Sequence, residues 1–338
     1  MLKHKSVVFF LVLIFFVILG CSSYKKAEQE QFLYGTTIRA VIYDKTGKGK
    51  ELIENCFKLM EEIDKKFNSR SNSGEFYKIN SSAGKEGIVV SDEAVDLIKR
   101  NFEMSDITNG SYDITMEPLF KLWGFEQQTR DKLPTTDEIR FALQNIGYKR
   151  VSIDGNRVKL PAGFSIESGP FLKGYGIHKA AEYLRKNGVK SGIITGVSSI
   201  ETIGRKPDGS KWKIGVQNPK NPEEMLGVLE LDNKSVGVSG DYQTFIEIDG
   251  KRYHHILSLK DGFPIKDIKL VVIVSDDSSS ADIYDTALFA CGKDKIEEAA
   301  SKIEGIEWLY VDSEMKLHQS KGMADYFKTA GGVLSEKR

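Results

Sequence analysis

Apolar residues recur every three or four positions along several segments of the chain, which is the spacing of one helix face. Residues 51–67 show this pattern most clearly, and it predicts four further helices over 91–105, 136–145, 174–187 and 279–291. A continuous apolar run over 270–275 predicts a buried strand, and residues 34–43 predict another. Residues 245–248 and 252–257 flank Asp249-Gly250, a dipeptide typical of a β-hairpin. With no repeat and no Pro-, Gly- or Ser-rich linker, the pattern predicts a single α+β unit of one or two lobes.

The N-terminus has the pattern of an export signal. Lys3 and Lys5 precede an unbroken apolar run over residues 7–19, which is shorter than the roughly 20 residues that a membrane span needs. The small residue Gly20 then precedes Cys21, which resembles a bacterial lipobox and implies cleavage before Cys21 and lipidation of that cysteine. The alternative is an ordinary signal peptide followed by an incidental cysteine. We expect a signal peptide over 1–20, a polar tether over 21–31, and a folded domain over 32–330 in a protein exported and lipid-anchored to the bacterial membrane.

Composition narrows the class of protein. The chain has 338 residues, with 48 Lys and Arg against 48 Asp and Glu, and 40% of its residues are hydrophobic. This balance excludes a disordered chain and argues against a nucleic-acid binder, which needs excess positive charge. Besides Cys21, only Cys56 and Cys291 remain. They are either two buried thiols or one disulfide, and no Cys/His spacing suggests zinc.

The most informative segment opens the predicted helix over 279–291. Asp282, Asp285 and Thr286 stand at positions i, i+3 and i+4, so their oxygens share one face of its beginning. Such oxygens are ligands that Mg²⁺ takes together with water and phosphate, and a helix N-terminus also favours phosphate. The alternative is that the helix dipole alone stabilises these aspartates.

A pair of adjacent histidines ends the second strand of the predicted hairpin. Alternation along a strand places His254 and His255 on opposite faces, so one of them can face a site. Histidine is the usual general base near neutral pH. The alternative is that both are ordinary polar residues of a strand.

Two glycine-containing segments carry further candidate residues. Residues 109–119 place Asp113 in a partly apolar stretch, where burial against a partner is expected, and Trp123 and Phe125 follow as core or ring-stacking residues. Residues 168–176 form a Gly-rich turn with Lys173 before a predicted helix, which suits phosphate binding. The spacing matches neither a P-loop nor a dinucleotide-binding fingerprint.

Taken in order, these segments resemble the ApbE family, the FAD:protein FMN transferases. The resemblance runs from Tyr34-Gly35-Thr36 to about Gly292. It includes the aromatic-Ser segment 67–69 followed by Glu75 and Asn80, and the stretch 110–125. It also includes an acidic residue, Glu167, before the Lys-Gly-Tyr turn at 173–175. It ends with His-His-Ile, a Gly-x-Pro turn, and Ala-Asp-x-x-x-Thr-Ala over 281–287.

The resemblance implies a fold, a reaction and a set of site residues. FAD would bind in a cleft between two lobes with Mg²⁺ at its pyrophosphate, and FMN would pass to a Thr or Ser hydroxyl of an exported acceptor protein, releasing AMP. His255 and Asp282 would be catalytic, with His255 as the base. The metal would be held by Asp282, Asp285, Thr286 and the carbonyl of Pro170. The residues at positions where the family contacts flavin or adenosine are Tyr34, Arg70, Ser111, Tyr112, Asp113, Glu167, Lys173 and Ile256.

Several positions depart from the family pattern while the metal triad is kept. Glu167 and His178 stand where Asp is common, Pro170 and Leu172 replace smaller residues, and the usual Gly-Gly loop is Val197-Ser198-Ser199. Ser258-Leu259 replaces Asp-Pro. These changes leave two alternatives to the transferase, namely an FAD pyrophosphatase that yields FMN and AMP, and a non-catalytic flavin-binding lipoprotein.

Overall fold

An eight-stranded sheet forms the centre of the computed structural model, which describes residues 24–125, 130–221 and 223–330. Every neighbouring pair of strands in it is antiparallel. The strands lie in the order β1 (Lys25–Leu33), β2 (Thr36–Asp44), β6 (Gly192–Gly196), β7 (Ser199–Ile203), β10 (Ser235–Gly240), β13 (Ile268–Ser275), β14 (Glu307–Asp312) and β15 (Leu317–Gln319). The predicted α+β class is confirmed.

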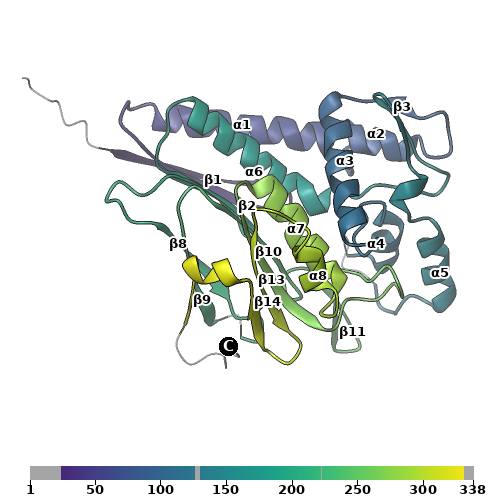
Figure 1. Ribbon diagram of the computed structural model, residues 1–338. Coiled ribbons are helices and arrows are strands. Elements are labelled where there is room, and N and C mark those ends of the chain that lie inside the picture. The colour runs from purple at the N-terminus through teal and green to yellow at the C-terminus, as the bar shows by residue number, and fades with distance from the viewer. Residues whose placement is uncertain (1–23, 126–129, 222, 331–338) are drawn as a thin grey trace, which may run out of the picture.

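Helices cover one face of this sheet (Figure 1). They are α1 (Gly49–Phe67), α6 (Gly169–Lys186), α7 (Ser278–Cys291) and α8 (Ile296–Ala300). Alternate residues of β2, such as Ile38 and Ile42, are fully buried in a core shared with Met60 of α1 and Ile177 and Leu184 of α6. The predicted helices over 51–67 and 279–291 and the buried strand over 270–275 are therefore confirmed to within two residues at each end.

A smaller sheet packs on the other face. It consists of β16 (Phe327–Thr329), β9 (Met225–Leu231) and β8 (Trp212–Gln217), and the short 3₁₀ helix η2 (Lys321–Asp325) lies beside it. Leu226 and Leu229 of β9 share a fully buried cluster with Val272 of β13 and Leu309 of β14. The main sheet is thus covered on both sides over its central strands.

A second, mainly helical lobe lies at one end of the sheet layer (Figure 1). The side chain of Ser91 accepts a hydrogen bond from Ala94 N and begins its longest helix, and Thr135 and Glu138 form a capping box on another. Trp123 is fully buried and donates to the Gly262 carbonyl, so it is a core residue. The lobe contains α2 (Glu75–Ser81), α3 (Asp92–Ile107), α4 (Glu117–Trp123), α5 (Thr136–Gln144), η1 (Tyr148–Arg150), β3 (Ile88–Val89), β4 (Ser152–Asp154) and β5 (Arg157–Lys159).

The predicted hairpin is confirmed as β11 (Phe245–Ile248) and β12 (Lys251–His254), but its second strand ends three residues before the predicted end at 257. Its two turn residues, Asp249 and Gly250, both have positive φ angles, of 51° and 72°. That conformation matches the twist of the flanking strands. The hairpin packs its apolar residues Ile246 and Ile248 against the α4–α5 cluster and so joins the sheet side of the molecule to the helical lobe.

The prediction of a polar tether over 21–31 is wrong for residues 25–31, which form most of strand β1. β1 pairs with β2 along its whole length, from Lys25 opposite Asp44 to Leu33 opposite Thr36. An edge strand is held by backbone hydrogen bonds and needs few apolar side chains, so Ala27 and Leu33 suffice on its inner face. The expected signal peptide and Cys21 lie outside the described residues. No helix in the described ranges has the length and apolar character that a bilayer crossing requires.

The segment over 168–176 is not a turn, because α6 begins at Gly169, five residues before the predicted start. Gly174 and Gly176 allow close crossings there. A Cβ at Gly174 would overlap Ser278 O and Asp282 of α7, and one at Gly176 would overlap the ring of Tyr34. Small residues at these positions therefore let α7 and the β1–β2 turn approach the backbone of α6.

Candidate active site

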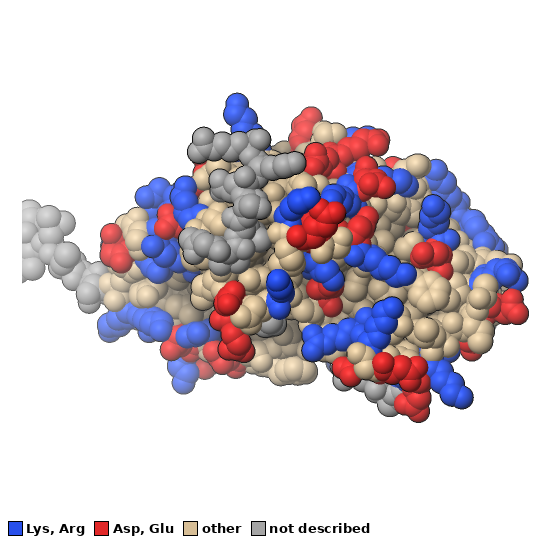
Figure 2. Space-filling model, turned by 90° about the horizontal axis from the view of Figure 1, so that it is seen from below, with Lys and Arg blue, Asp and Glu red and all other residues tan. Residues whose placement is uncertain are grey.

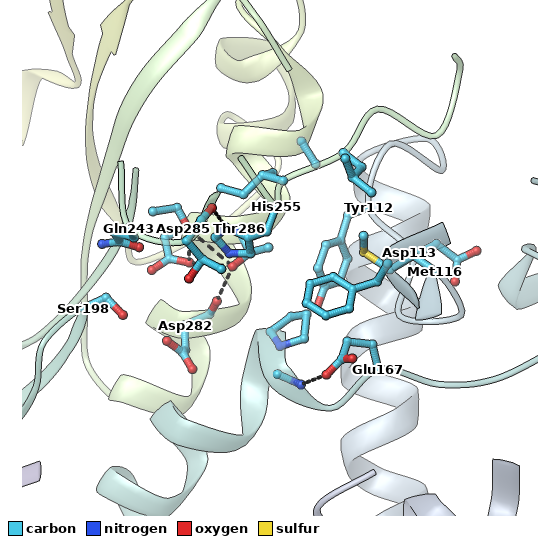
Figure 3. Close-up of a pocket in the computed structure, with 18 of the residues that line it drawn as sticks. Tyr112, Asp113, Met116, Glu167, Ser198, Gln243, His255, Asp282, Asp285 and Thr286 are labelled. Carbon is cyan, nitrogen blue, oxygen red and sulfur yellow. Dashed lines mark hydrogen bonds between the residues drawn. The ribbon is translucent and has the colours of Figure 1, made fainter. Parts of the chain in front are cut away.

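A cavity of about 200 Å³ lies between α7 and the helical lobe. It brings together twelve of the thirteen predicted site residues that fall in the described part of the chain. They are Arg70, Ser111, Tyr112, Asp113, Glu167, Pro170, Lys173, His255, Ile256, Asp282, Asp285 and Thr286. Figure 3 shows Asp282, Asp285, Thr286 and His255 on one side of it and Tyr112, Asp113 and Glu167 on the other. Segments far apart in sequence thus meet around one space.

Tyr34 is the predicted site residue that does not line this cavity. Its hydroxyl donates to the carbonyl of Met60 at 2.7 Å, and burial raises its pKa well above the ordinary value. Its ring lies against Gly176 of α6. In this structure Tyr34 packs the β1–β2 turn against two helices and has no direct access to the cavity.

Asp282 is held at the crossing of α6 and α7. It is 3% exposed, and its Oδ2 accepts a hydrogen bond from Gly174 N at 2.8 Å. The Nζ atom of Lys173 lies 3.2 Å from Oδ1, which also accepts from the hydroxyl of Ser199. A buried carboxylate is tolerated when paired and hydrogen-bonded in this way.

Asp285 lies one helical turn further along α7 and is equally buried. The hydroxyls of Ser239 and Thr286 donate to its Oδ1 at 3.0 and 2.9 Å. Burial and the neighbouring charge of Asp282 raise the pKa of Asp285 well above its usual range. Two buried carboxylates beside one lysine form a site that is short of positive charge.

The donor set at this point fits a hard divalent cation. Asp282, Asp285 and Thr286 contribute oxygens, and Pro170, whose carbonyl remains available, lines the same cavity. Within the described ranges, no three His, Cys, Asp or Glu side chains converge as a metal-binding group. A cation held here would therefore take its remaining ligands from hydroxyl and carbonyl oxygens, water and substrate phosphate.

The two histidines have different surroundings, as expected, although β12 ends at His254 and His255 lies in the bend that follows. His255 lines the cavity, and its Nδ1 lies 3.1 Å from the Thr244 carbonyl. A carbonyl only accepts, so Nδ1 carries the proton and Nε2 is left as the acceptor. Burial, with Lys173 and His254 nearby, lowers the pKa of His255 to about 4. His254 instead contacts the Ile265 carbonyl and the ring of Phe289, away from the cavity.

The opposite wall is fixed by a second ion pair. Arg70 Nη2 lies 2.7 Å from Glu167 Oε2, and Gly169 N donates to Glu167 Oε1 at 2.7 Å. Glu167 is 2% exposed, and the guanidinium of Arg70 also lies over the ring of Phe120. The longer acid found here in place of Asp thus caps the start of α6 and orients Arg70 toward the cavity.

Asp113 is positioned by its own loop. Its carboxylate accepts from Thr115 N, Thr115 Oγ1 and Tyr148 N at 2.7–2.8 Å. Burial raises its pKa in spite of these hydrogen bonds. The expectation that Asp113 is buried with partners is confirmed, and the loop it stabilises presents Ser111 and Tyr112 to the cavity.

The Val197-Ser198-Ser199 segment forms the β6–β7 turn at the cavity. Ser198 Oγ accepts from Lys173 Nζ at 2.7 Å, and Ser199 donates to Asp282. Val197 has a φ of +58° and is 72% exposed. A β-branched residue is strained in this conformation, which glycine adopts freely. The segment thus supplies two hydroxyls at the ion pair and carries backbone strain at Val197.

A buried acid, Glu201, lies behind the cavity and was not predicted from the sequence. Glu201 of β7 is fully buried and accepts from Ser278 N at 3.0 Å and Ser278 Oγ at 2.7 Å. Arg185 donates to the same carboxylate, and His178 Nδ1 lies 3.2 Å from it. The network holds the start of α7 and hence the aspartates that follow. Its only signal in the sequence is one acidic residue between the apolar Ile200 and Ile203 of the strand 199–203.

The comparisons with known proteins agree with this geometry. The model of the ApbE family matches residues 34–310. The chain belongs to the ApbE family. An FAD:protein FMN transferase of Vibrio cholerae is 28% identical over 286 residues, covering 82% of this chain and 85% of the relative. One of Treponema pallidum is 24% identical over 328 residues and 90% of both chains. The crystal structure of the ApbE protein from Thermotoga maritima superimposes with a TM-score of 0.83 at 28% identity, over 89% of this chain and 99% of that one.

Proposed function

We propose that this protein transfers FMN from FAD to a Thr or Ser hydroxyl of an exported acceptor protein and releases AMP, with Mg²⁺ as its metal. The observation that carries the proposal is the convergence of Lys173, the buried Asp282–Asp285 pair and a neutral His255 on one cavity. Relatives that share most of the chain's length are named FAD:protein FMN transferases.

Each group has a part in such a reaction. The Nε2 atom of His255 accepts the proton of the acceptor hydroxyl, since Nδ1 is committed to Thr244. The hydroxyl oxygen bonds to the phosphorus of the FMN half, and the bond from that phosphorus to the bridging oxygen breaks, so that AMP leaves with the bridging oxygen. Lys173 places a positive charge beside the diphosphate.

The metal would be held by Asp282, Asp285, Thr286 and the Pro170 carbonyl. When bound, Mg²⁺ would offset negative charge on the phosphoryl oxygens. Ser239 and Gly174 orient the two carboxylates toward this space through the hydrogen bonds described above. The protein thus contributes carboxylate oxygens that are buried and held in a fixed orientation.

The export signal completes the proposal. We propose that the mature protein is anchored to the bacterial membrane by a lipid on Cys21, in the periplasm or on the outer face of the membrane, where exported acceptors are available. The supporting observation is the sequence pattern of residues 3–21.

The test uses the purified protein, FAD and MgCl₂, with and without exported proteins from cells that lack this gene. We expect AMP release and flavin fluorescence on a denatured acceptor band, with both lost in His255→Ala and Asp282→Asn. Asp294→Asn, an exposed substitution outside the cavity, is the matched control. FMN and AMP formed equally without acceptor would show a pyrophosphatase, and no consumption of FAD would show a binding protein.

A further inference from the structure

The end of the main sheet where β1 begins is strongly basic. Four segments meet there, namely residues 24–26, 44–50, 186–191 and 204–211. Lys25 pairs with Asp44, Tyr43 N bonds to the Ser191 carbonyl, and Gly204 approaches the Lys190 carbonyl. Together these segments contain ten Lys or Arg and two Asp, in a chain whose formal net charge is zero.

Few acidic side chains neutralise this end. Asp44 is buried and accepts hydrogen bonds from Thr46 and Lys48 N. Ion pairs with neighbouring acids engage Lys26 with Glu28, Lys50 with Glu54 and Arg205 with Asp232. The lysines at 25, 45, 48, 186 and 190 are exposed. Figure 2 shows Lys and Arg side chains at this end of the molecule, interspersed with acidic ones as they are over the rest of this face.

Aromatic rings lie among the lysines. Lys45 Nζ lies 4.4 Å from the centroid of Tyr24, which is 38% exposed. Lys206 Nζ lies 5.6 Å from the centroid of Trp212, which is itself buried. An exposed tyrosine among Lys and Arg side chains is typical of the head-group level of membranes. The chemistry of this end therefore suits an anionic lipid surface.

The chain length before β1 places this end close to the bilayer. Cys21 stands three positions before Tyr24, the first described residue, and an extended chain covers at most about 3.5 Å per position. A lipid on Cys21 would hold Tyr24 within about 10 Å of the membrane surface. That is comparable to the Debye length at physiological salt, so the lysines would feel the surface potential.

We propose that this end of the sheet, formed by residues 24–26, 44–50, 186–191 and 204–211, is a membrane-contact face that binds anionic phospholipid head groups. The lipid anchor and the basic face then act as two attachments, and the second fixes the orientation that a flexible lipid anchor alone would leave free. The inference relies on the lipid anchor and is independent of the chemistry of the cavity.

The test is hydrogen exchange of the acylated protein on vesicles. Intact mass first establishes acylation of Cys21, so that a missing anchor is distinguished from a missing surface contact. Vesicles contain phosphatidylcholine alone or with phosphatidylglycerol. We expect exchange in segments 44–50, 186–191 and 204–211 to slow several-fold on the phosphatidylglycerol vesicles only, and the protection to disappear in about 1 M salt, where the Debye length is about 3 Å.

Charge reversal gives the matched comparison. Lys45→Glu, Lys48→Glu and Lys190→Glu together are expected to abolish the protection. Lys85→Glu, Lys99→Glu and Lys159→Glu, three exposed lysines of the helical lobe, are expected to leave it intact. Equal protection on neutral vesicles, protection that survives the first triple variant, or its loss in the second would overturn the proposal. Thermal unfolding of both variants identifies any that fail to fold.

Discussion

Gly174 N donates a hydrogen bond to Asp282 Oδ2 at 2.8 Å, which ties the backbone of α6 directly to a cavity carboxylate on α7. The contact exists because position 174 has no side chain. The two helices cross at this point, and Lys173 next to it reaches the same carboxylate. Helix packing and the electrostatics of the cavity are therefore determined by the same few atoms.

Gly174→Ala is expected to separate the two helices. The new Cβ would overlap Ser278 O and Asp282 Cβ, and overpacking of a tight core costs up to ~3 kcal/mol. We expect a lower free energy of unfolding in urea and loss of AMP release from FAD. Lys186→Ala, at an exposed position of the same helix, is the control for an alanine substitution in α6. Retained stability together with retained activity would contradict the tight crossing.

Asp285→Asn tests whether the two buried carboxylates, Asp282 and Asp285, carry more negative charge than Lys173 neutralises. Without divalent cation the variant should melt at a higher temperature than the wild type, because a buried like-charge repulsion is removed while Ser239 and Thr286 can still donate to the amide oxygen. Adding MgCl₂ should raise the melting temperature of the wild type and leave that of the variant unchanged. A variant that is less stable than the wild type in EDTA would show that the two carboxylates do not repel one another in the metal-free protein.

The His178–Glu201 pair should make stability depend on pH. Burial alone would lower the pKa of His178, but its contact with Glu201 raises it above the ordinary 6.5 on balance. Its contribution is then present in full below about pH 6.5 and is lost as the pH rises through the folded-state pKa. We expect the stability difference between wild type and His178→Gln to be larger at about pH 6 than at about pH 8.5. Parallel urea profiles at both pH values would refute this.

Val197→Gly should relieve backbone strain at the cavity rim. Glycine adopts the φ of +58° without penalty, and Val197 makes little packing contribution at 72% exposure. The expected gain is about 1 kcal/mol in the free energy of unfolding, measured in urea, with Ser198 and Ser199 unaltered. A decrease would mean that the valine side chain makes a stabilising contact.

Local patterns were enough to predict elements with strong periodicity or specific caps. α1 shows a regular apolar stripe, α3 begins at the capping residue Ser91, and Asp249-Gly250 forms the hairpin turn. The cavity was predictable in outline because motifs from separate segments matched one family in order. The same residues do meet in space, although the catalytic and binding roles assigned to them remain predictions.

The predictions that were wrong or missing concern features that depend on contacts between distant segments. Gly174 and Gly176 suggest a turn, yet both lie within α6. They are glycines because α7 and Tyr34 occupy the space that their side chains would take. β1 is polar because an edge strand requires pairing more than burial. Glu201 could not be recognised from sequence, since its partners lie on α6 and α7 and only the fold brings them to β7.

The pairing of β1 with β2 also sets the distance between Lys25 and the cavity. A nine-residue strand is roughly 30 Å long, and the turn that ends it reaches Gly176, close to Lys173 at the cavity. If the start of β1 rests on the bilayer, the reactive centre stands at a set height above the lipid. Acceptors would then be selected by how far their hydroxyl projects from the membrane, and a target threonine flush with the head groups would go unmodified.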